Sequence, residues 1–211
     1  MRKVGVDVTN VAVGDRVNWF GFGNFRTIER VDFRFLQKLR PEESFNEMAC
    51  LMVPFLTACY GLIHAAKLQR GETVLIHSGT GGVGLAAIQI ARIIGAEIFT
   101  TVGNTDKKEF LKKKYGFDDD HILSSRDTSF AADIMRLTKG RGVDVTLNSV
   151  VGERLRATWS IIGRHGRHIE LGQTDILDHG TMDMSPFRRA ASFVAMDLVL
   201  DAKHRPELVS S

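Results

Sequence analysis

The sequence predicts an α/β protein built around a doubly wound parallel sheet. Three observations support this fold class. Short apolar segments alternate regularly with helical ones from residue 73 onward, the first apolar segment ends in a glycine-rich loop, and that loop leads directly into a helical segment. Strands that alternate with helices of this length are joined by crossover connections, which place neighbouring strands parallel. Residues 1 to about 40 lack this alternation and predict the end of an all-β region.

Each element follows from its local pattern. Residues 13–17 predict a turn and a strand, and residues 25–35 are rich in strand-forming residues. A helical zone opens at Pro41 and carries apolar residues at helical spacing over 44–68, with a break expected near Pro54. The sheet strands are expected at 73–77, 96–102, 120–124, 143–148, 166–171 and near 192–199, and the helices between them at 83–95, 105–115, 127–138 and 151–162.

The composition excludes several classes of protein. The 211 residues are 44% hydrophobic with a net charge of +3, which suits a globular protein with a sizeable core. No apolar run is long enough to span a bilayer, and the N-terminal residues lack the apolar core that is typical of a signal peptide. Cys50 and Cys59 do not form a disulfide scaffold or a zinc site. We interpret the lysines at 107, 108 and 112–114 as a solvated helix face. We expect a cytoplasmic protein that binds no metal, nucleic acid or membrane.

The loop after the first sheet strand predicts a dinucleotide site. Residues 79–84 read G-x-G-x-x-G and lie between an apolar strand and a helical segment. Glycines allow the backbone to turn sharply and to approach a diphosphate, which then sits at the positive end of the helix. The same glycine pattern also occurs in ordinary turns, but this strand–loop–helix context favours a cofactor. The candidate residues are Gly79, Gly81, Gly82, Val83 and Gly84.

The end of the next strand indicates which nicotinamide cofactor is preferred. Proteins that bind NAD place an acidic residue here to hold the ribose 2′-hydroxyl. This sequence has Gly103 and Asn104 at that point, so no carboxylate would repel a 2′-phosphate. Lys107 lies in the first turn of the following helix and could pair with that phosphate, although it could also be a surface charge. The pattern therefore favours NADPH over NADH.

Several motifs in register resemble one family. The segments are VLIHSGTGGVGLAAIQIARIIGAEIFTTVGNTDKKEFL, HILSSRDTSF, GRGVDVTLNSV and GRHIELG, and the resemblance runs from about Val13 to Leu198. They resemble the enoylreductase domain of reducing polyketide synthases and animal fatty acid synthase, a zinc-free member of the medium-chain dehydrogenase/reductase superfamily. The resemblance implies that NADPH delivers a hydride to the β-carbon of an α,β-unsaturated acyl thioester while an acid protonates the α-carbon. It also implies a carrier-bound polyketide substrate, other synthase domains as partners, and a possible homodimer.

The resemblance assigns roles to individual positions. The glycine loop would hold the pyrophosphate, and Lys107 the 2′-phosphate. Asn104 stands where the family usually has serine. Three further residues match cofactor-side positions, and two of them have a structural alternative. Arg126, which would lie near the adenosine phosphate, could be a surface residue at a helix start, and Thr57, at the nicotinamide end, could be bonded to its own helix backbone. The candidate cofactor residues outside the loop are Asn104, Lys107, Arg126, Asn148 and Thr57.

One departure from the family concerns the proton donor. Gln173 stands where the family usually has a lysine that is a proposed proton donor. A carboxamide donates hydrogen bonds but does not release a proton at a useful pKa. The other candidate acid of the family matches Asp197, which is retained. The candidate catalytic residues are therefore Asp197 and Gln173, and turnover is uncertain on this evidence.

A second departure concerns the ends of the chain. The family fold is a GroES-like β-barrel followed by a Rossmann domain, and this sequence matches only part of the barrel. We expect residues 1–50 to be a partial barrel region, 51–200 the NADPH-binding domain and 201–211 a truncated tail. Three functions stay open: enoyl reduction in polyketide assembly, a catalytically inactive domain kept for architecture, and a free-standing quinone or enone reductase.

Overall fold

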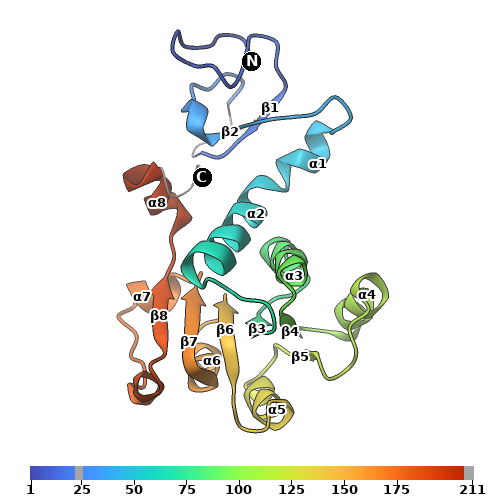
Figure 1. Cartoon of the computed structure of the whole chain (residues 1–211), viewed down its shortest axis with the longest axis vertical. Coiled ribbons are helices and arrows are strands. Elements are labelled where there is room, and N and C mark those ends of the chain that lie inside the picture. The colour runs from blue at the N-terminus through green and yellow to red at the C-terminus, as the bar shows by residue number, and fades with distance from the viewer. Residues whose placement is uncertain (22–25, 207–211) are drawn as a thin grey trace. The chain divides into compact units, whose positions relative to one another are not determined.

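A computed structural model describes residues 1–21 and 26–206 of the chain (Figure 1). The chain divides into two compact units. One comprises Met1–Thr57 with Asp197–Ser211, and the other comprises Ala58–Met196. The sequence placed domain boundaries at residues 50 and 200, and these boundaries remain a prediction.

The unit Ala58–Met196 contains a six-stranded sheet in the order β5-β4-β3-β6-β7-β8. All five neighbouring pairs are parallel, and Figure 1 shows β6, β7 and β8 as adjacent arrows. The strand order reverses direction between β3 and β6, which is where ligands bind in such sheets. The predicted α/β class with a doubly wound parallel sheet is confirmed. The strands are β3 (Thr73–Ile76), β4 (Glu97–Val102), β5 (Ile122–Ser124), β6 (Val143–Asn148), β7 (Ile162–Glu170) and β8 (Ser192–Ala195).

Helices connect these strands at the positions that the sequence periodicity predicts. α3 ends at Gly95, whose φ of 86° is left-handed and suits glycine. The predicted helix over 151–162 ends earlier, at Ser160, because Ile162 is buried as the first residue of β7. The helices of this unit include α3 (Gly82–Ile94), α4 (Thr105–Tyr115), α5 (Ser129–Leu137), α6 (Glu153–Ser160) and α7 (Thr174–Leu177), with a π-helix at Tyr60–Ala65 and a 3-10 helix at Ser185–Arg189.

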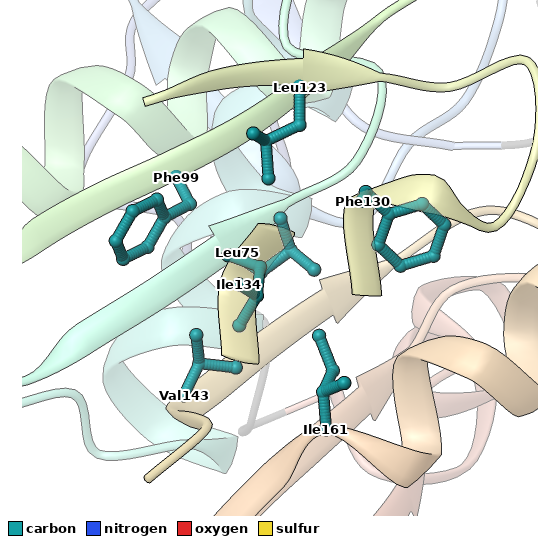
Figure 2. Close-up of a cluster of buried hydrophobic side chains, with 7 residues drawn as sticks. All are labelled: Leu75, Phe99, Leu123, Phe130, Ile134, Val143 and Ile161. Atoms are coloured by element: carbon teal, nitrogen blue, oxygen red, sulfur yellow. The ribbon is translucent and has the colours of Figure 1, made fainter. Parts of the chain in front are cut away.

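One apolar cluster fixes α5 against the sheet. Side chains from β3, β4 and β5 lie beside Phe130 and Ile134 of α5, and Figure 2 shows how they converge. Truncating a buried side chain of this size to alanine costs about 2–5 kcal/mol. The cluster therefore holds α5 against these strands. Its members are Leu75, Phe99, Leu123, Phe130, Ile134, Val143 and Ile161.

The unit formed by Met1–Thr57 and Asp197–Ser211 has little regular structure. Its strands β1 (Val17–Trp19) and β2 (Leu36–Lys38) pair antiparallel and are three residues long. The strand-rich segment expected at 25–35 instead contains a 3-10 helix at Phe33–Phe35, because Asp32 accepts the Arg34 amide and starts a tight turn. Residues 22–25 lie outside the described residues. The barrel remnant is therefore not confirmed. The helices are α1 (Phe45–Ala49), α2 (Met52–Cys59) and α8 (Leu198–His204).

Two predicted boundaries near this unit differ from the structure by a few residues. The helical zone breaks at Cys50–Leu51, and Pro54 lies inside the first turn of α2, where its missing N–H costs no helix hydrogen bond. The strand expected near 192–199 ends at Ala195 because Asp197 caps α8. Among the described residues, no helix is long and apolar enough to cross a membrane.

Candidate functional site

The glycine loop connects β3 to α3 and packs tightly against its surroundings. A Cβ on Gly79 would overlap the hydroxyl of Thr100 on β4, and a Cβ on Gly84 would overlap the carbonyl oxygen of Ser78. A Cβ on Gly81 would lie 3.2 Å from that same oxygen. The loop therefore requires glycine at these positions to bring α3 close to the strand ends.

The N-terminus of α3 presents backbone donors that no side chain caps in the described part of the chain. Gly81 is the N-cap and has no side chain to bond the first turn, and the first helix bond recorded is Leu85 N to Gly81 O at 2.8 Å. The amides of Gly82, Val83 and Gly84 thus lie in the turn where N–H groups have no partner within the helix. A bare, glycine-lined helix start is a good receptor for a diphosphate, so the residues present fit a dinucleotide.

The start of α4 places one lysine without an ion pair beside the end of β4. Asn104 is the N-cap, and its Oδ1 accepts the Lys107 amide at 3.0 Å. Lys108 pairs with Asp119 at 2.8 Å, and Lys112 pairs with the same carboxylate at 3.3 Å. Lys107 is exposed and has no ion-pair partner among the described residues. Of the first two lysines of α4, only Lys107 is therefore left to meet an anion.

Arg126 reaches the same strand end from the loop after β5. Its Nε donates to the Gly103 carbonyl oxygen at 2.6 Å, which fixes the side chain against the end of β4. Its two Nη groups have no partner in the described part of the chain. Arg126 and Lys107 are 19 positions apart in the sequence, and the structure brings them to the same edge of the sheet.

Asn148 lies at the end of β6 and is fully buried. Its Nδ2 donates to the Val150 carbonyl oxygen at 2.8 Å and to Glu170 Oε2 at 2.6 Å, and its Oδ1 is buried without a recorded partner. Glu170 also accepts the Gly172 amide at 2.6 Å and lies 3.1 Å from His168 Nε2. The ends of β6 and β7 are therefore tied to each other by a buried carboxylate.

The two halves of the sheet meet where the strand order reverses. Ser149, after β6, and Ser78, after β3, have hydroxyl oxygens 3.4 Å apart. Ser78 has a φ of 56°, an unusual conformation for a residue other than glycine. Strained residues of this kind concentrate at ligand-binding loops, and this one lies directly before the glycine loop.

Gln173 and Asp197, the two candidate catalytic residues, each have bonds of their own. Gln173 is half-buried at the start of α7, and its Nε2 lies 3.4 Å from the Met196 carbonyl oxygen, a long hydrogen bond. Asp197 Oδ1 accepts the amides of Val199 at 2.9 Å and Leu200 at 3.1 Å, so this carboxyl caps α8.

Thr57, the remaining candidate, is bonded to the backbone of its own helix, which was the structural alternative considered for it. Its hydroxyl donates to the Val53 carbonyl oxygen one turn earlier in α2, at 2.8 Å. The hydroxyl oxygen still has lone pairs that can accept a hydrogen bond. Thr57 can thus serve a ligand only as an acceptor while this bond is kept.

Sequence reasoning missed His77, which is almost fully buried beneath the loop. Burial first, and then the electrostatic influence of His168 and Arg154, lower the pKa of His77 to about 3, so the His77 imidazole is neutral at physiological pH. Its Nδ1 lies 3.0 Å from Thr101 Oγ1, and its Nε2 lies 2.8 Å from Thr158 Oγ1. The available signal was a histidine at the end of an otherwise apolar strand.

The described residues do not fit a zinc ion. Among them, no group of three or more His, Cys, Asp or Glu side chains is placed to hold a metal. Cys50 is exposed and Cys59 is half-buried, and both are free thiols.

Comparison with known proteins agrees with this geometry. The family model described as zinc-binding dehydrogenase matches residues 82–197. The chain is 61% identical over its whole length to reducing polyketide synthase BOA9 of Botryotinia fuckeliana (strain B05.10), of which it spans 8%.

Two solved structures also match. The crystal structure of CurK enoyl reductase is 37% identical with a TM-score of 0.87, over 99% of this chain and 61% of that one. The nucleotide-binding subdomain of the enoylreductase domain of PpsC from Mycobacterium tuberculosis is 42% identical with a TM-score of 0.71, over 75% of this chain and 87% of that one. The chain therefore belongs to the enoyl reductase domains of polyketide synthases, within the medium-chain dehydrogenase/reductase superfamily.

Proposed function

We propose that this chain binds NADPH at the carboxyl edge of β3 and β4 and reduces an α,β-unsaturated acyl thioester during polyketide assembly. One juxtaposition is the main support. The uncapped start of α3 lies next to a strand end where Lys107 and Arg126 present unpaired cationic groups. A diphosphate and a 2′-phosphate are the two anions that NADPH brings to such an edge.

The residues present suit NADPH better than NADH. Gly103 and Asn104 supply no carboxylate, so the 2′-phosphate meets no like charge from them. Asn104 uses its Oδ1 to cap α4, which holds the first turn and the Lys107 backbone in place. A charge-assisted contact contributes about 1.5–3 kcal/mol in a partly enclosed site and at most about 1 kcal/mol when exposed. We therefore expect a preference for NADPH of roughly ten- to a hundredfold.

The reduction needs a hydride at the β-carbon, which NADPH supplies when bound, and a proton at the α-carbon. In this proposal, protein hydrogen-bond donors stabilise the enolate that forms. The Gln173 carboxamide can donate such a bond but cannot release the proton. The proton then comes from the Asp197 carboxyl or from solvent. The Asp197 Oδ2 oxygen is left for this role, because the amides of Val199 and Leu200 both donate to Oδ1.

The substrate and partners follow from the synthases that the chain matches. The chain spans about 8% of the length of the curated polyketide synthases that it matches. The acyl thioester would be carried by an acyl carrier protein, and other domains of the same synthase would be its neighbours. A second copy of this domain, in a homodimer of the synthase, is a further proposed partner.

A second candidate is a domain that binds cofactor without turnover. Two observations favour it: Gln173 cannot act as an acid, and the Asp197 carboxyl caps a helix. The two candidates differ in whether bound NADPH is consumed.

NADPH consumption by the purified chain distinguishes these candidates. The chain is offered a crotonyl thioester in one arm and a quinone in the other. Consumption with the thioester is the result that we expect. Consumption with the quinone alone would make the protein a quinone reductase, and binding without consumption in either arm would make it an inactive domain.

A further inference from the structure

A continuous path of hydrogen bonds runs beneath the glycine loop from β4 through β3 to α6. The Ser78 amide donates to Thr101 Oγ1 at 3.3 Å, and Thr101 Oγ1 lies 3.0 Å from His77 Nδ1. On the other side of the ring, His77 Nε2 lies 2.8 Å from Thr158 Oγ1. The Thr158 hydroxyl lies 2.8 Å from the Arg154 carbonyl oxygen one turn earlier in α6. His77, Thr101 and Thr158 are all buried.

One arrangement of protons satisfies every donor in this path. If Nε2 carries the hydrogen, it donates to Thr158, whose own hydroxyl donates to the Arg154 carbonyl oxygen. Nδ1 is then a bare lone pair, and the Thr101 hydroxyl donates to it. With the hydrogen on Nδ1 instead, the Thr101 hydroxyl would lose this acceptor in a buried site, which costs free energy. The bonds therefore favour the neutral Nε2–H form of His77.

This arrangement fixes the Thr101 hydroxyl with a lone pair toward the loop. That lone pair receives the Ser78 amide, while the Ser78 carbonyl oxygen accepts the Gly81 amide at 2.8 Å. Both backbone groups of Ser78 are thus bonded, and its left-handed φ of 56° is held from both sides. The conformation of Ser78 therefore determines the position of the backbone amides at the start of α3.

We propose that His77, acting through Thr101, is a positioning residue that holds the Ser78 turn and so shapes the glycine loop for the cofactor diphosphate. This inference rests on the proposed binding of NADPH. Because the effect concerns the diphosphate, it applies equally to NADPH and NADH. Lys107 would act on NADPH alone, which separates the two contributions.

Two substitutions at His77 separate its two ring nitrogens. In His77→Asn, the side-chain oxygen can replace Nδ1 as the acceptor for Thr101, but the bond to Thr158 is lost. In His77→Gln, the longer amide can keep the bond to Thr158, but the acceptor for Thr101 is lost. Calorimetric titration with NADPH and with NADH should show about tenfold weaker binding of both cofactors for His77→Gln and near-normal binding for His77→Asn.

Substitutions at Thr101 test the same link from its other end. Thr101→Val removes the hydroxyl at nearly constant volume and should weaken both cofactors about tenfold, whereas Thr101→Ser should restore binding. Thr138→Val is the matched control. Like Thr101, Thr138 has a hydroxyl that accepts a backbone amide, in this case that of Gly142. The Thr138 hydroxyl donates to the Ile134 carbonyl oxygen, and the residue lies outside the glycine loop. It should lower stability without changing cofactor affinity.

Two measurements need no cofactor, so they separate this inference from the proposed function. Nitrogen-15 NMR should show His77 as the neutral Nε2–H form, and hydrogen exchange at the Ser78 amide should speed up in Thr101→Val. An Nδ1–H ring, or unchanged Ser78 exchange, would overturn the inference even if the wild type binds NADPH well. Unchanged affinity in both His77→Gln and Thr101→Val would overturn it too. A wild type that binds neither cofactor would contradict the proposed function instead.

Discussion

The two halves of the parallel sheet end in different ways. The half formed by β3, β4 and β5 ends in groups that are ready to receive an anion, namely the bare start of α3 and the unpaired ammonium of Lys107. The half formed by β6, β7 and β8 ends in groups bonded to one another. Asn148 and the Gly172 amide are held by Glu170, and the Gly152 amide is held by Asp175 at 3.0 Å.

This difference separates cofactor binding from chemistry. A phosphate site needs only backbone amides and cations, and the first half has both. Proton delivery needs an acid whose proton is free to leave, and Gln173, the proposed donor position in the second half, is a carboxamide that releases no proton at a useful pKa. We infer that the first half can bind cofactor whether or not the second half completes the reaction.

Gln173→Lys should have the largest effect, because it adds an acid to the second half. General-acid assistance is typically worth about 10²–10⁴-fold in rate, so reduction of a crotonyl thioester should rise within that range. Gln173→Met, which has similar length and no acid, is the matched control and should not raise the rate. If the wild type already reduces the thioester well and the lysine variant is no faster, the proton comes from elsewhere.

Gly84→Ala should damage the first half. The new Cβ would overlap the Ser78 carbonyl oxygen, so either the turn or α3 must shift. Overpacking of this kind costs about 1–3 kcal/mol, and we expect roughly ten- to a hundredfold weaker binding of both cofactors by titration. Gly81→Ala meets the same oxygen at 3.2 Å and should lose less. Equal binding by Gly84→Ala and wild type would show that the close packing is not needed.

Glu170→Ala should destabilise the second half through its buried network. The carboxylate accepts bonds from Asn148 and Gly172 and lies 3.1 Å from His168 Nε2, and removing it leaves buried donors unpaired. We expect a loss of about 3–5 kcal/mol in the free energy of unfolding, measured with urea. Asp119→Ala breaks exposed ion pairs in the first half and should stay close to wild type. Similar losses in both variants would remove the contrast between the halves.

The smallest effect concerns His121, at the start of β5 and away from the phosphate edge. Burial alone would lower its pKa, but hydrogen bonds to Asp118 at 2.6 Å and Glu97 at 3.3 Å outweigh burial, and the pKa is raised above the ordinary 6.5. The charged ring therefore stabilises the fold below about pH 6.5, and this stabilisation is lost as the pH rises through the folded-state pKa.

The pH dependence of unfolding tests this sign. The stability difference between wild type and His121→Gln should shrink by about 0.5 kcal/mol from pH 6 to pH 8, since both carboxylates are largely exposed and screened. Asp118→Asn should reduce the same pH dependence. A difference that grows with pH would show that burial, and not the carboxylates, controls the ring.

The sequence predicted the elements whose signals are local. The loop at 79–84, its flanking strand and helix, and the lysine in the first turn of α4 all depend on residues close in the chain. Where the predicted secondary structure differs from the structure, the reason is also found in residues close in the chain. Pro54 was expected to break a helix, but it occupies a first turn, where proline is tolerated. Strand-forming residues near Phe33 instead follow the turn that Asp32 starts.

The buried networks could not be predicted, because their members lie far apart in the sequence. His77 and Thr158 are 81 positions apart, and Asn148 and Glu170 are 22 apart. A single sequence shows a histidine in an apolar strand but not the two hydroxyls that flank its ring. Equally, the sequence placed Asp197 at a strand end, but only the structure shows its carboxyl capping α8.

Calorimetric titration of the wild type and Lys107→Ala with NADPH and NADH tests the central claim most directly, with Lys113→Ala as the control on the same helix. We predict that the wild type binds NADPH roughly ten- to a hundredfold more tightly than NADH, that Lys107→Ala removes most of this preference, and that Lys113→Ala keeps it. Equal affinity of the wild type for both cofactors, or a preference that survives Lys107→Ala, would contradict the account.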